Sequence, residues 1–148
     1  HARFAELLSD HAAPAHLSER LSQAEGRNLG RYGFGIKGFV LSMIETAVEV
    51  TDARVPASVI RELVEAGKDM LAHPIELLPH AAETVAGLAP QARLVLITKG
   101  DLLDQERKLA QSGLGAHFDA VEIVSDKTRA TYARIFAGRP RAIMVGNS

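Results

Sequence analysis

The chain has 148 residues, of which 47% are hydrophobic and 24% charged, and its formal net charge is −1 at pH 7. This composition is typical of a globular protein with one ordinary domain, or with a core and a small second unit, and it excludes an intrinsically disordered chain. A net charge so close to zero gives no general attraction to nucleic acid or to an anionic membrane, so we expect neither as a partner. The sequence has no cysteine, which excludes disulfides, thiolate catalysis and cysteine metal sites and fits a cytoplasmic protein.

The first half of the chain, residues 1–73, shows only helical periodicity. Apolar residues recur at spacings of three and four in four stretches, which Pro14, the glycines between residues 30 and 38, and Pro56 separate. Four helices with short connections favour a small helical bundle. The four stripes are Phe4, Leu7 and Leu8; Leu17 and Leu21; Phe39, Val40, Leu41, Ile44 and Val48; and Val59, Ile60, Leu63, Val64, Met70 and Leu71.

The period changes in the second half of the chain, residues 74–148. Strands that alternate with helices predict right-handed βαβ units and a parallel sheet with helices on both faces. We therefore expect an α/β domain here and a domain boundary near His73 and Pro74. The short β-type runs are residues 94–97, 121–124 and 142–145, and the helical stretches are about 79–88, 102–112 and 127–137.

Polar residues follow each of the three predicted strands. Ligands of open α/β sheets bind at the carboxyl ends of the strands, so these residues should meet at one edge. A hydroxyl, backbone N–H groups beside glycine, and a lysine together suit a phosphate. Any one of these segments could be an ordinary turn, but three in order favour a phosphate site. The candidates are Thr98, Lys99 and Gly100 after the first strand, Lys127 after the second, and Gly146, Asn147 and Ser148 after the third.

The same segments resemble motifs II to IV of the haloacid dehalogenase superfamily. Residues 94–100 (LVLITKG) resemble motif II, an apolar strand that ends in Thr or Ser, and residues 113–127 (GLGAHFDAVEIVSDK) resemble the approach to motif III, whose lysine would be Lys127. Residues 141–148 (RAIMVGNS) resemble the start of motif IV. The helix before motif II is also similar, with His80 where Gly is frequent. The helical first half is similar to the cap that these enzymes insert after motif I, so the resemblance covers the whole chain.

The resemblance implies a Rossmann-like parallel core over residues 74–148 and a helical cap domain over residues 1–73. Thr98 and the neighbouring backbone N–H groups would hold a phosphoryl group, and Lys127 would neutralise the phosphate and a nucleophilic carboxylate. The implied enzyme is a Mg²⁺-dependent phosphatase that acts on a small phosphorylated metabolite through an aspartyl-phosphate. Lys99 stands where Asn is commoner, which leaves the substrate class open.

The resemblance also implies two catalytic elements that the 148 residues do not include. One is the D-x-D of motif I, whose strand would lie between the motif II and motif IV strands, and the other is the acidic metal ligand that ends motif IV. We therefore expect no metal ligands in this chain, a further strand upstream of His1, and no activity from the 148 residues alone. Two alternatives stay open: a non-catalytic binding or regulatory module on the same fold, and a haloacid dehalogenase, which needs no metal.

A glycine-rich segment in the first half has a second interpretation. Residues 33–38 satisfy G-x-G-x-x-G, but no β-type run precedes them, as a dinucleotide site requires. We interpret the segment as a loop between two cap helices. Arg31, Tyr32 and Lys37 around it are candidate substrate contacts.

Four residues near the domain boundary have the spacing of a zinc site on one helix face. Two prolines, Pro74 and Pro79, interrupt any continuous helix there, so we expect no metal site. The four residues are His73, Glu76, His80 and Glu83.

Overall fold

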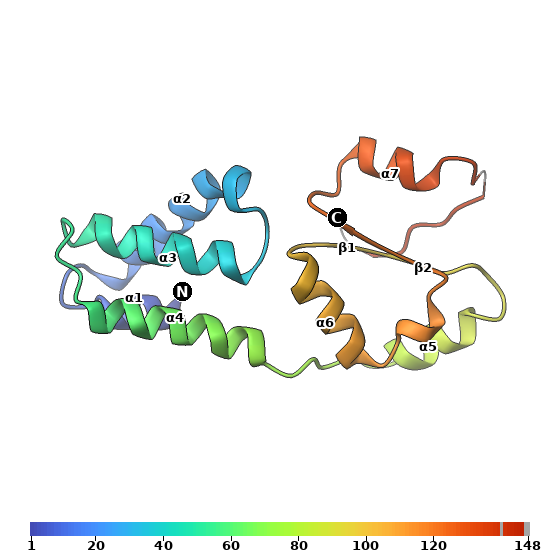
Figure 1. Cartoon of the computed structure of the whole chain (residues 1–148), viewed down its shortest axis with the longest axis horizontal. Coiled ribbons are helices and arrows are strands. Elements are labelled where there is room, and N and C mark those ends of the chain that lie inside the picture. Colours follow the sequence, from blue (N-terminus) through green and yellow to red (C-terminus); the bar gives the residue numbers. More distant parts are fainter. Residues whose placement is uncertain (140, 147–148) are drawn as a thin grey trace. The chain divides into compact units, whose positions relative to one another are not determined.

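A computed structural model describes residues 1–139 and 141–146 of the chain (Figure 1). The chain divides into two compact units, His1–His73 and Pro74–Ser148, and the division lies where the sequence period changes from helical to mixed. Within the described residues, no helix is both long and apolar enough to cross a membrane. Whether the first unit acts as a cap stays a prediction.

The first unit consists of four helices, as the apolar stripes predict (Figure 1). Both prolines lie at helix starts: Pro14 in the first turn of its helix and Pro56 at an N-cap. A proline is tolerated there because the first N–H groups of a helix have no partner within the helix. The helices are α1 (Ala2–Leu7), α2 (Pro14–Tyr32), α3 (Ile36–Val50) and α4 (Ala57–Ala72).

The core of the first unit lies where α2 meets α1 and α3, and where α3 meets α4. Burial of large apolar side chains is the main stabilising term for such a bundle, at about 1.5–3 kcal/mol for each fully buried side chain. Leu41 and Val48 belong to a predicted stripe but remain about two-fifths exposed. The most deeply buried large side chains are Phe4, Leu8, Leu17, Leu21 and Leu63.

Gly67 sets how closely α4 approaches α3. It is buried in α4, and a Cβ added to it would lie 2.3 Å from Val40 Cγ2. We expect Gly67→Ala to lower the free energy of unfolding by about 1–3 kcal/mol, because Val40 cannot move without disturbing the core. The matched control is Gly26→Ala in α2, where nothing lies within 4 Å of the added Cβ. It should raise stability by about 0.5–1 kcal/mol through better helix propensity. Urea denaturation measures both, and a stabilising Gly67→Ala would contradict this account of the packing.

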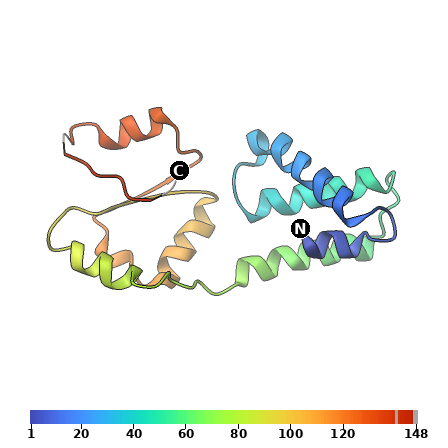
Figure 2. The ribbon, with the colours of Figure 1, turned by 180° about the vertical axis from the view of Figure 1, so that it is seen from behind.

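The second unit is an α/β layer structure. In its described residues the sheet has two strands, paired in parallel from Val95 opposite Ala120 to Lys99 opposite Val124. Both ribbon views place α5 and α6 on one face of the strands and α7 on the other (Figures 1 and 2). This arrangement confirms the predicted parallel α/β fold. The elements are α5 (Ala81–Leu88), β1 (Val95–Lys99), α6 (Leu102–Ser112), a 3-10 turn (Gly115–His117), β2 (Ala120–Val124) and α7 (Arg129–Phe136).

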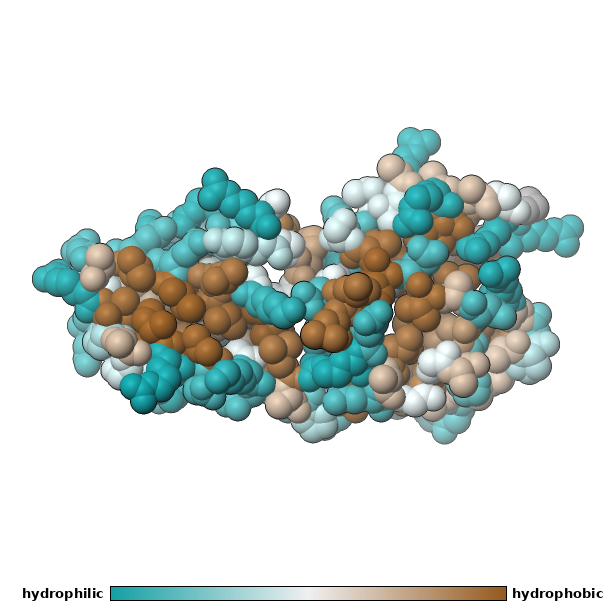
Figure 3. All heavy atoms as spheres, in the orientation of Figure 1, coloured by the Kyte–Doolittle hydropathy of each residue, from teal (hydrophilic) through white to brown (hydrophobic). Residues whose placement is uncertain are grey.

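The prediction of a third strand at residues 142–145 is wrong. These residues form no strand, because a strand needs a hydrogen-bonded neighbour and nothing in the described residues pairs with them. Gly146 likewise lies outside any helix or strand, and Asn147 and Ser148 lie outside the described residues. Part of the surface of this unit is apolar, and hydrophobic (brown) areas are visible among hydrophilic ones in Figure 3. Leu78, Leu102, Leu103, Ile143 and Val145 are 59–91% exposed.

Local capping explains where the helices of the second unit begin and end. Helix α6 has the predicted bounds, because the Asp101 side chain accepts a hydrogen bond from the Asp104 N–H at its start and Gly113 takes a left-handed conformation at its end. Helix α7 begins at Arg129 rather than Lys127, because the Thr128 side chain caps it. His80 has a φ of 65° before α5, which is the left-handed region that favours glycine.

Candidate functional site

The loops that follow β1 and β2 meet at the carboxyl edge of the sheet. The Gly100 N–H donates to the Val124 carbonyl at 3.3 Å, so the turn after β1 stays bonded to the end of β2. Beyond it, Lys99 Nζ lies 3.7 Å from Asp126 Oδ1. Paired residues of β1 and β2 are 25 residues apart in the sequence. These contacts join the segments that follow the two strands, because parallel strands bring their carboxyl ends to one edge of the sheet.

Thr98 lies within β1 rather than after it, because the strand continues to Lys99. Its side chain is on the α6 side of the sheet, where its Oγ1 donates to Gln105 Oε1 at 2.6 Å. Thr98, Leu96 and Gln105 line a cavity of about 200 Å³ between the strand and that helix, with Lys108, Leu109 and residues of the following loop. Gln105 was not predicted from the sequence. The only local indication of its role is that it is a polar residue near the start of the helix that follows the candidate loop.

The backbone conformation of Gly100 requires glycine, and the Gln105 side chain lies close to it. Its φ is 146°, which side chains other than glycine rarely adopt, and an added Cβ would lie 2.9 Å from Gln105 Nε2. The backbone of the loop can therefore pass close to the Gln105 amide.

The loop after β2 is held by its own hydrogen bonds. Asp126 Oδ1 accepts from the backbone N–H of Lys127 at 2.8 Å, and the Asp126 carbonyl accepts from Thr131 Oγ1 at 3.0 Å. Lys127 itself is half-buried. The structure therefore brings the segments of Thr98, Lys99, Gly100 and Lys127 to one edge of the sheet. Whether the Thr98 hydroxyl and the Lys127 ammonium face one cleft stays a prediction.

Asp104, which sequence reasoning did not single out as a site residue, is a buried carboxylate beside the candidate loop. It is 4% exposed, and its oxygens lie 2.6 Å from Arg107 Nη2 and 2.8 Å from Lys108 Nζ. Burial opposes its ionisation, but the hydrogen bonds and charges of Lys108 and Arg107 outweigh burial and hold the pKa of this carboxyl below its ordinary value. Both oxygens are engaged within α6, so Asp104 braces the start of the helix.

The carboxylates near the strand ends do not fit a magnesium ion by themselves. Mg²⁺ takes oxygen ligands in a near-octahedral arrangement. Asp101 caps α6 and Asp126 bonds within its own loop and lies near Lys99. Across residues 1–139 and 141–146, no group of three or more His, Cys, Asp or Glu side chains could hold a metal. The ligands of any Mg²⁺ would therefore have to include other carboxylates.

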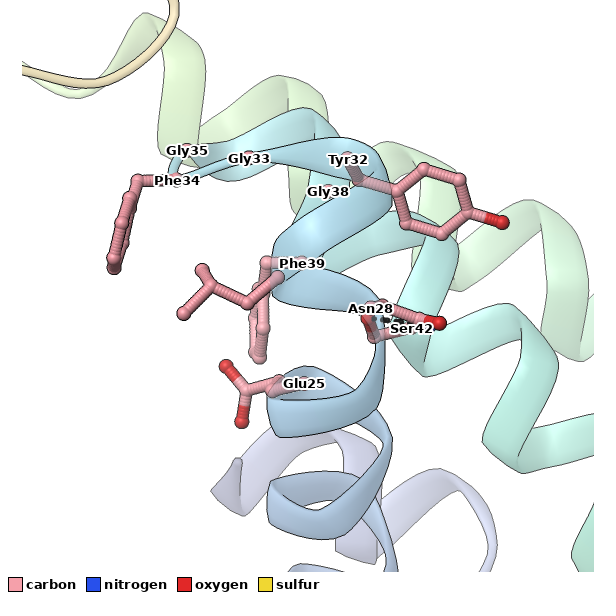
Figure 4. A pocket seen from close by; sticks show the side chains of 10 residues that line it. Glu25, Asn28, Tyr32, Gly33, Phe34, Gly35, Gly38, Phe39 and Ser42 are labelled. Carbon is pink, nitrogen blue, oxygen red and sulfur yellow. Dashed lines mark hydrogen bonds between the residues drawn. The ribbon is translucent and has the colours of Figure 1, made fainter. Parts of the chain in front are cut away.

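Residues 33–35 of the glycine-rich segment connect α2 to α3, and residues 36–38 form the start of α3, so the segment joins two helices as interpreted from the sequence. Gly33 and Gly35 have φ values of 71° and 141°. Figure 4 shows the loop beside a cavity of about 110 Å³, with Asn28 and Ser42 hydrogen-bonded on its wall. No strand precedes it in the described structure, so the segment lacks the setting of a dinucleotide site.

The candidate contacts around this loop have different surroundings. Tyr32 is 40% exposed and its hydroxyl donates to Glu45 Oε1 at 2.5 Å. This hydrogen bond, with a second from Asn28, holds the pKa of Glu45 below its ordinary value, and it raises the pKa of Tyr32. Arg31 and Lys37 are exposed, in the last turn of α2 and the first turn of α3. Their contact with a substrate, and that of Tyr32, stays a prediction.

The four residues with zinc-like spacing do not share a helix. Helix α4 ends at Ala72 and α5 begins at Ala81, so His73, Glu76 and His80 lie between the two helices and only Glu83 is helical. His80 Nδ1 and Glu83 Oε2 form an exposed pair at 3.1 Å.

Comparison with known proteins finds a similar hydrolase among the solved structures. No protein-family model and no curated protein matches the chain. Among solved structures, the chain is similar to a haloacid dehalogenase-like family hydrolase from Xanthomonas campestris, with 45% sequence identity, a TM-score of 0.85 and coverage of 92% of this chain. The match covers 57% of the other chain, so this sequence spans less than two thirds of the length of that protein.

Proposed function

Because the chain belongs to the haloacid dehalogenase-like hydrolases, we propose that the protein containing it is a Mg²⁺-dependent phosphatase of small phosphorylated metabolites. The observation that carries the proposal is the meeting of two strand-end loops at one edge of a parallel sheet. The end of β1 supplies the Thr98 hydroxyl and the Lys99 ammonium, the turn at Gly100 holds this segment against the end of β2, and the loop after β2 supplies Lys127. Donors and positive charge gathered at a strand edge suit a phosphoryl group, whose oxygens only accept hydrogen bonds.

Each residue at this edge has a distinct task in the proposed reaction. Thr98 and backbone N–H groups that follow Gly100 orient the phosphoryl group, since the Gly100 N–H itself donates to the Val124 carbonyl. Lys127 offsets the negative charge that the phosphate and an approaching carboxylate bring together. A carboxylate that the described residues do not provide would attack phosphorus, form an aspartyl-phosphate and release the alcohol of the substrate. Water would then hydrolyse the acyl phosphate and release inorganic phosphate.

The first unit would select the substrate in this proposal. Arg31, Tyr32 and Lys37 lie on either side of its loop at residues 33–35, and cationic and aromatic groups of this kind suit a phosphorylated metabolite. The proposed substrate is a small molecule, and the proposal includes no nucleic acid or membrane partner and places the protein in the cytoplasm.

A non-catalytic binding module on the same fold is the second candidate function. The observation that favours it is the lack of a metal-binding group of acidic side chains in the described part of the chain. Such a module would bind phosphate at the same loops without turning it over, since binding and chemistry need different groups.

The proposed function is tested with an aryl phosphate as substrate. We expect the full-length protein to hydrolyse it with Mg²⁺ and to lose turnover in EDTA, and the 148 residues alone to show no turnover above background. Phosphate binding without turnover by the full-length protein would favour the binding module. Halide release from a 2-haloacid that EDTA does not affect would identify a dehalogenase. Metal-dependent turnover by the 148 residues alone would contradict our account of what the chain lacks.

A further inference from the structure

The side chain of Gln105 is hydrogen-bonded to Thr98 in β1 and lies close to Gly100 in the loop that follows. Its Oε1 accepts from Thr98 Oγ1 at 2.6 Å, and its Nε2 lies where an added Cβ on Gly100 would come within 2.9 Å. The backbone of Gln105 is held in the first turn of α6, because its N–H donates to the Asp101 carbonyl at 3.0 Å. The amide therefore reaches Thr98 from a fixed part of the helix.

The direction of the Thr98 hydroxyl decides what this edge of the sheet can bind. A threonine hydroxyl has one proton, whereas phosphoryl oxygens can only accept hydrogen bonds. While that proton is donated to Gln105 Oε1, Thr98 offers a phosphoryl group nothing but lone pairs. If the Gln105 amide turns over, Nε2 donates to Thr98 Oγ1 and the hydroxyl proton becomes available to a phosphoryl oxygen.

We propose that Gln105 is a positioning residue that sets the direction of the Thr98 hydroxyl. The amide oxygen faces Thr98 as in this structure, and the amide nitrogen faces it when a phosphoryl group is bound. The inference rests on the function proposed above, which places Thr98 against the phosphoryl group. The change exchanges donor and acceptor within one hydrogen-bonded pair and moves no atom between residues.

Two substitutions separate this role from simple packing. Gln105→Glu supplies only acceptors when ionised, so it keeps the Thr98 proton for itself, whereas Gln105→Met has a similar size and neither donates nor accepts strongly. In the full-length protein we expect Gln105→Glu to raise both the KM for an aryl phosphate and the inhibition constant of inorganic phosphate by about 10- to 100-fold. Gln105→Met should raise them by only about 3- to 10-fold. Because the lost interaction acts on binding, kcat should change less than KM in both variants.

A double-mutant cycle with Thr98→Ala identifies the partner. Without the Thr98 hydroxyl, Gln105→Glu has nothing to direct, and its effect on the inhibition constant should shrink to about 3-fold or less. The matched control is Gln111→Glu, which makes the same change on an exposed part of α6 and should leave both constants within about twofold. Far-UV circular dichroism checks that each variant is folded. If Gln105→Glu does not fold, Gln105→Met takes its place in the cycle with Thr98→Ala.

The outcomes distinguish this inference from the proposed function. If Gln105→Glu has the same effect with and without Thr98, or if Gln105→Met weakens phosphate binding as much as Gln105→Glu, the directing role is wrong while the phosphatase stands. If the unmodified protein neither hydrolyses the aryl phosphate nor binds inorganic phosphate, the proposed function fails, and this inference fails with it.

Discussion

Lys127→Ala should lower the rate of phosphate-ester hydrolysis by the full-length protein by roughly 100- to 1,000-fold. Lys127 is half-buried in the loop after β2, and its backbone N–H donates to Asp126 Oδ1. A cation held by the scaffold needs little reorganisation as negative charge develops, so its removal acts mainly on the transition state. We therefore expect kcat to fall more than KM rises, which steady-state kinetics with an aryl phosphate will measure.

Two variants control this experiment. Lys127→Arg keeps the positive charge and should retain more activity than Lys127→Ala, although the planar guanidinium does not reproduce a point charge. Lys68→Ala removes the same charge from the exposed surface of α4, where Lys68 pairs with Glu65, and should leave both constants unchanged. Full turnover by the Lys127→Ala protein would remove the catalytic role assigned to this lysine.

Leu21→Ala should lower the free energy of unfolding of the first unit by about 2–5 kcal/mol. Leu21 is 0% exposed in α2 and lies in the core cluster with Phe4, Leu17 and Leu63. Truncation removes buried apolar surface and leaves a cavity that the surrounding helices can fill only in part. Urea denaturation followed by far-UV circular dichroism measures the change, because loss of this unit removes most of the helical residues in the described part of the chain.

Leu29→Ala is the matched control for this prediction. Leu29 lies in the same helix but is 40% exposed, so the same truncation removes less buried surface and should cost about 1 kcal/mol or less. Equal destabilisation by the two substitutions would show that the core of the first unit is not centred where the structure places it.

Much of the secondary structure could be predicted because it depends on local patterns. The four helical stripes, the two strands and the bounds of α6 follow from the period of apolar residues and from capping by Asp101 and Gly113. The prediction of a third strand at residues 142–145 was wrong, because a strand forms only against a partner strand. An apolar run contains no information about whether that partner is present. The same run is therefore left exposed at Ile143 and Val145.

The candidate site could be predicted only in outline. The order of strands and polar residues indicated that the segments of Thr98 and Lys127 would share one edge, and the parallel pairing of β1 and β2 has this geometry. The sequence did not indicate that β1 continues through Thr98 and Lys99, because strand ends depend on the hydrogen bonds to the neighbouring strand.

By itself, the sequence determined the helical and α/β halves of the chain, the parallel order of its strands and the residues that follow them, because periodicity and strand order constrain these features. Only the tertiary structure decided that Thr98 faces α6, that Gln105 is the partner of its hydroxyl and that Asp104 is buried. A helix turns by a full circle about every 3.6 residues, so small differences in where it starts and how it packs decide which polar side chain reaches the strand. Such contacts depend on how the helix packs against the sheet, and no local pattern specifies that packing.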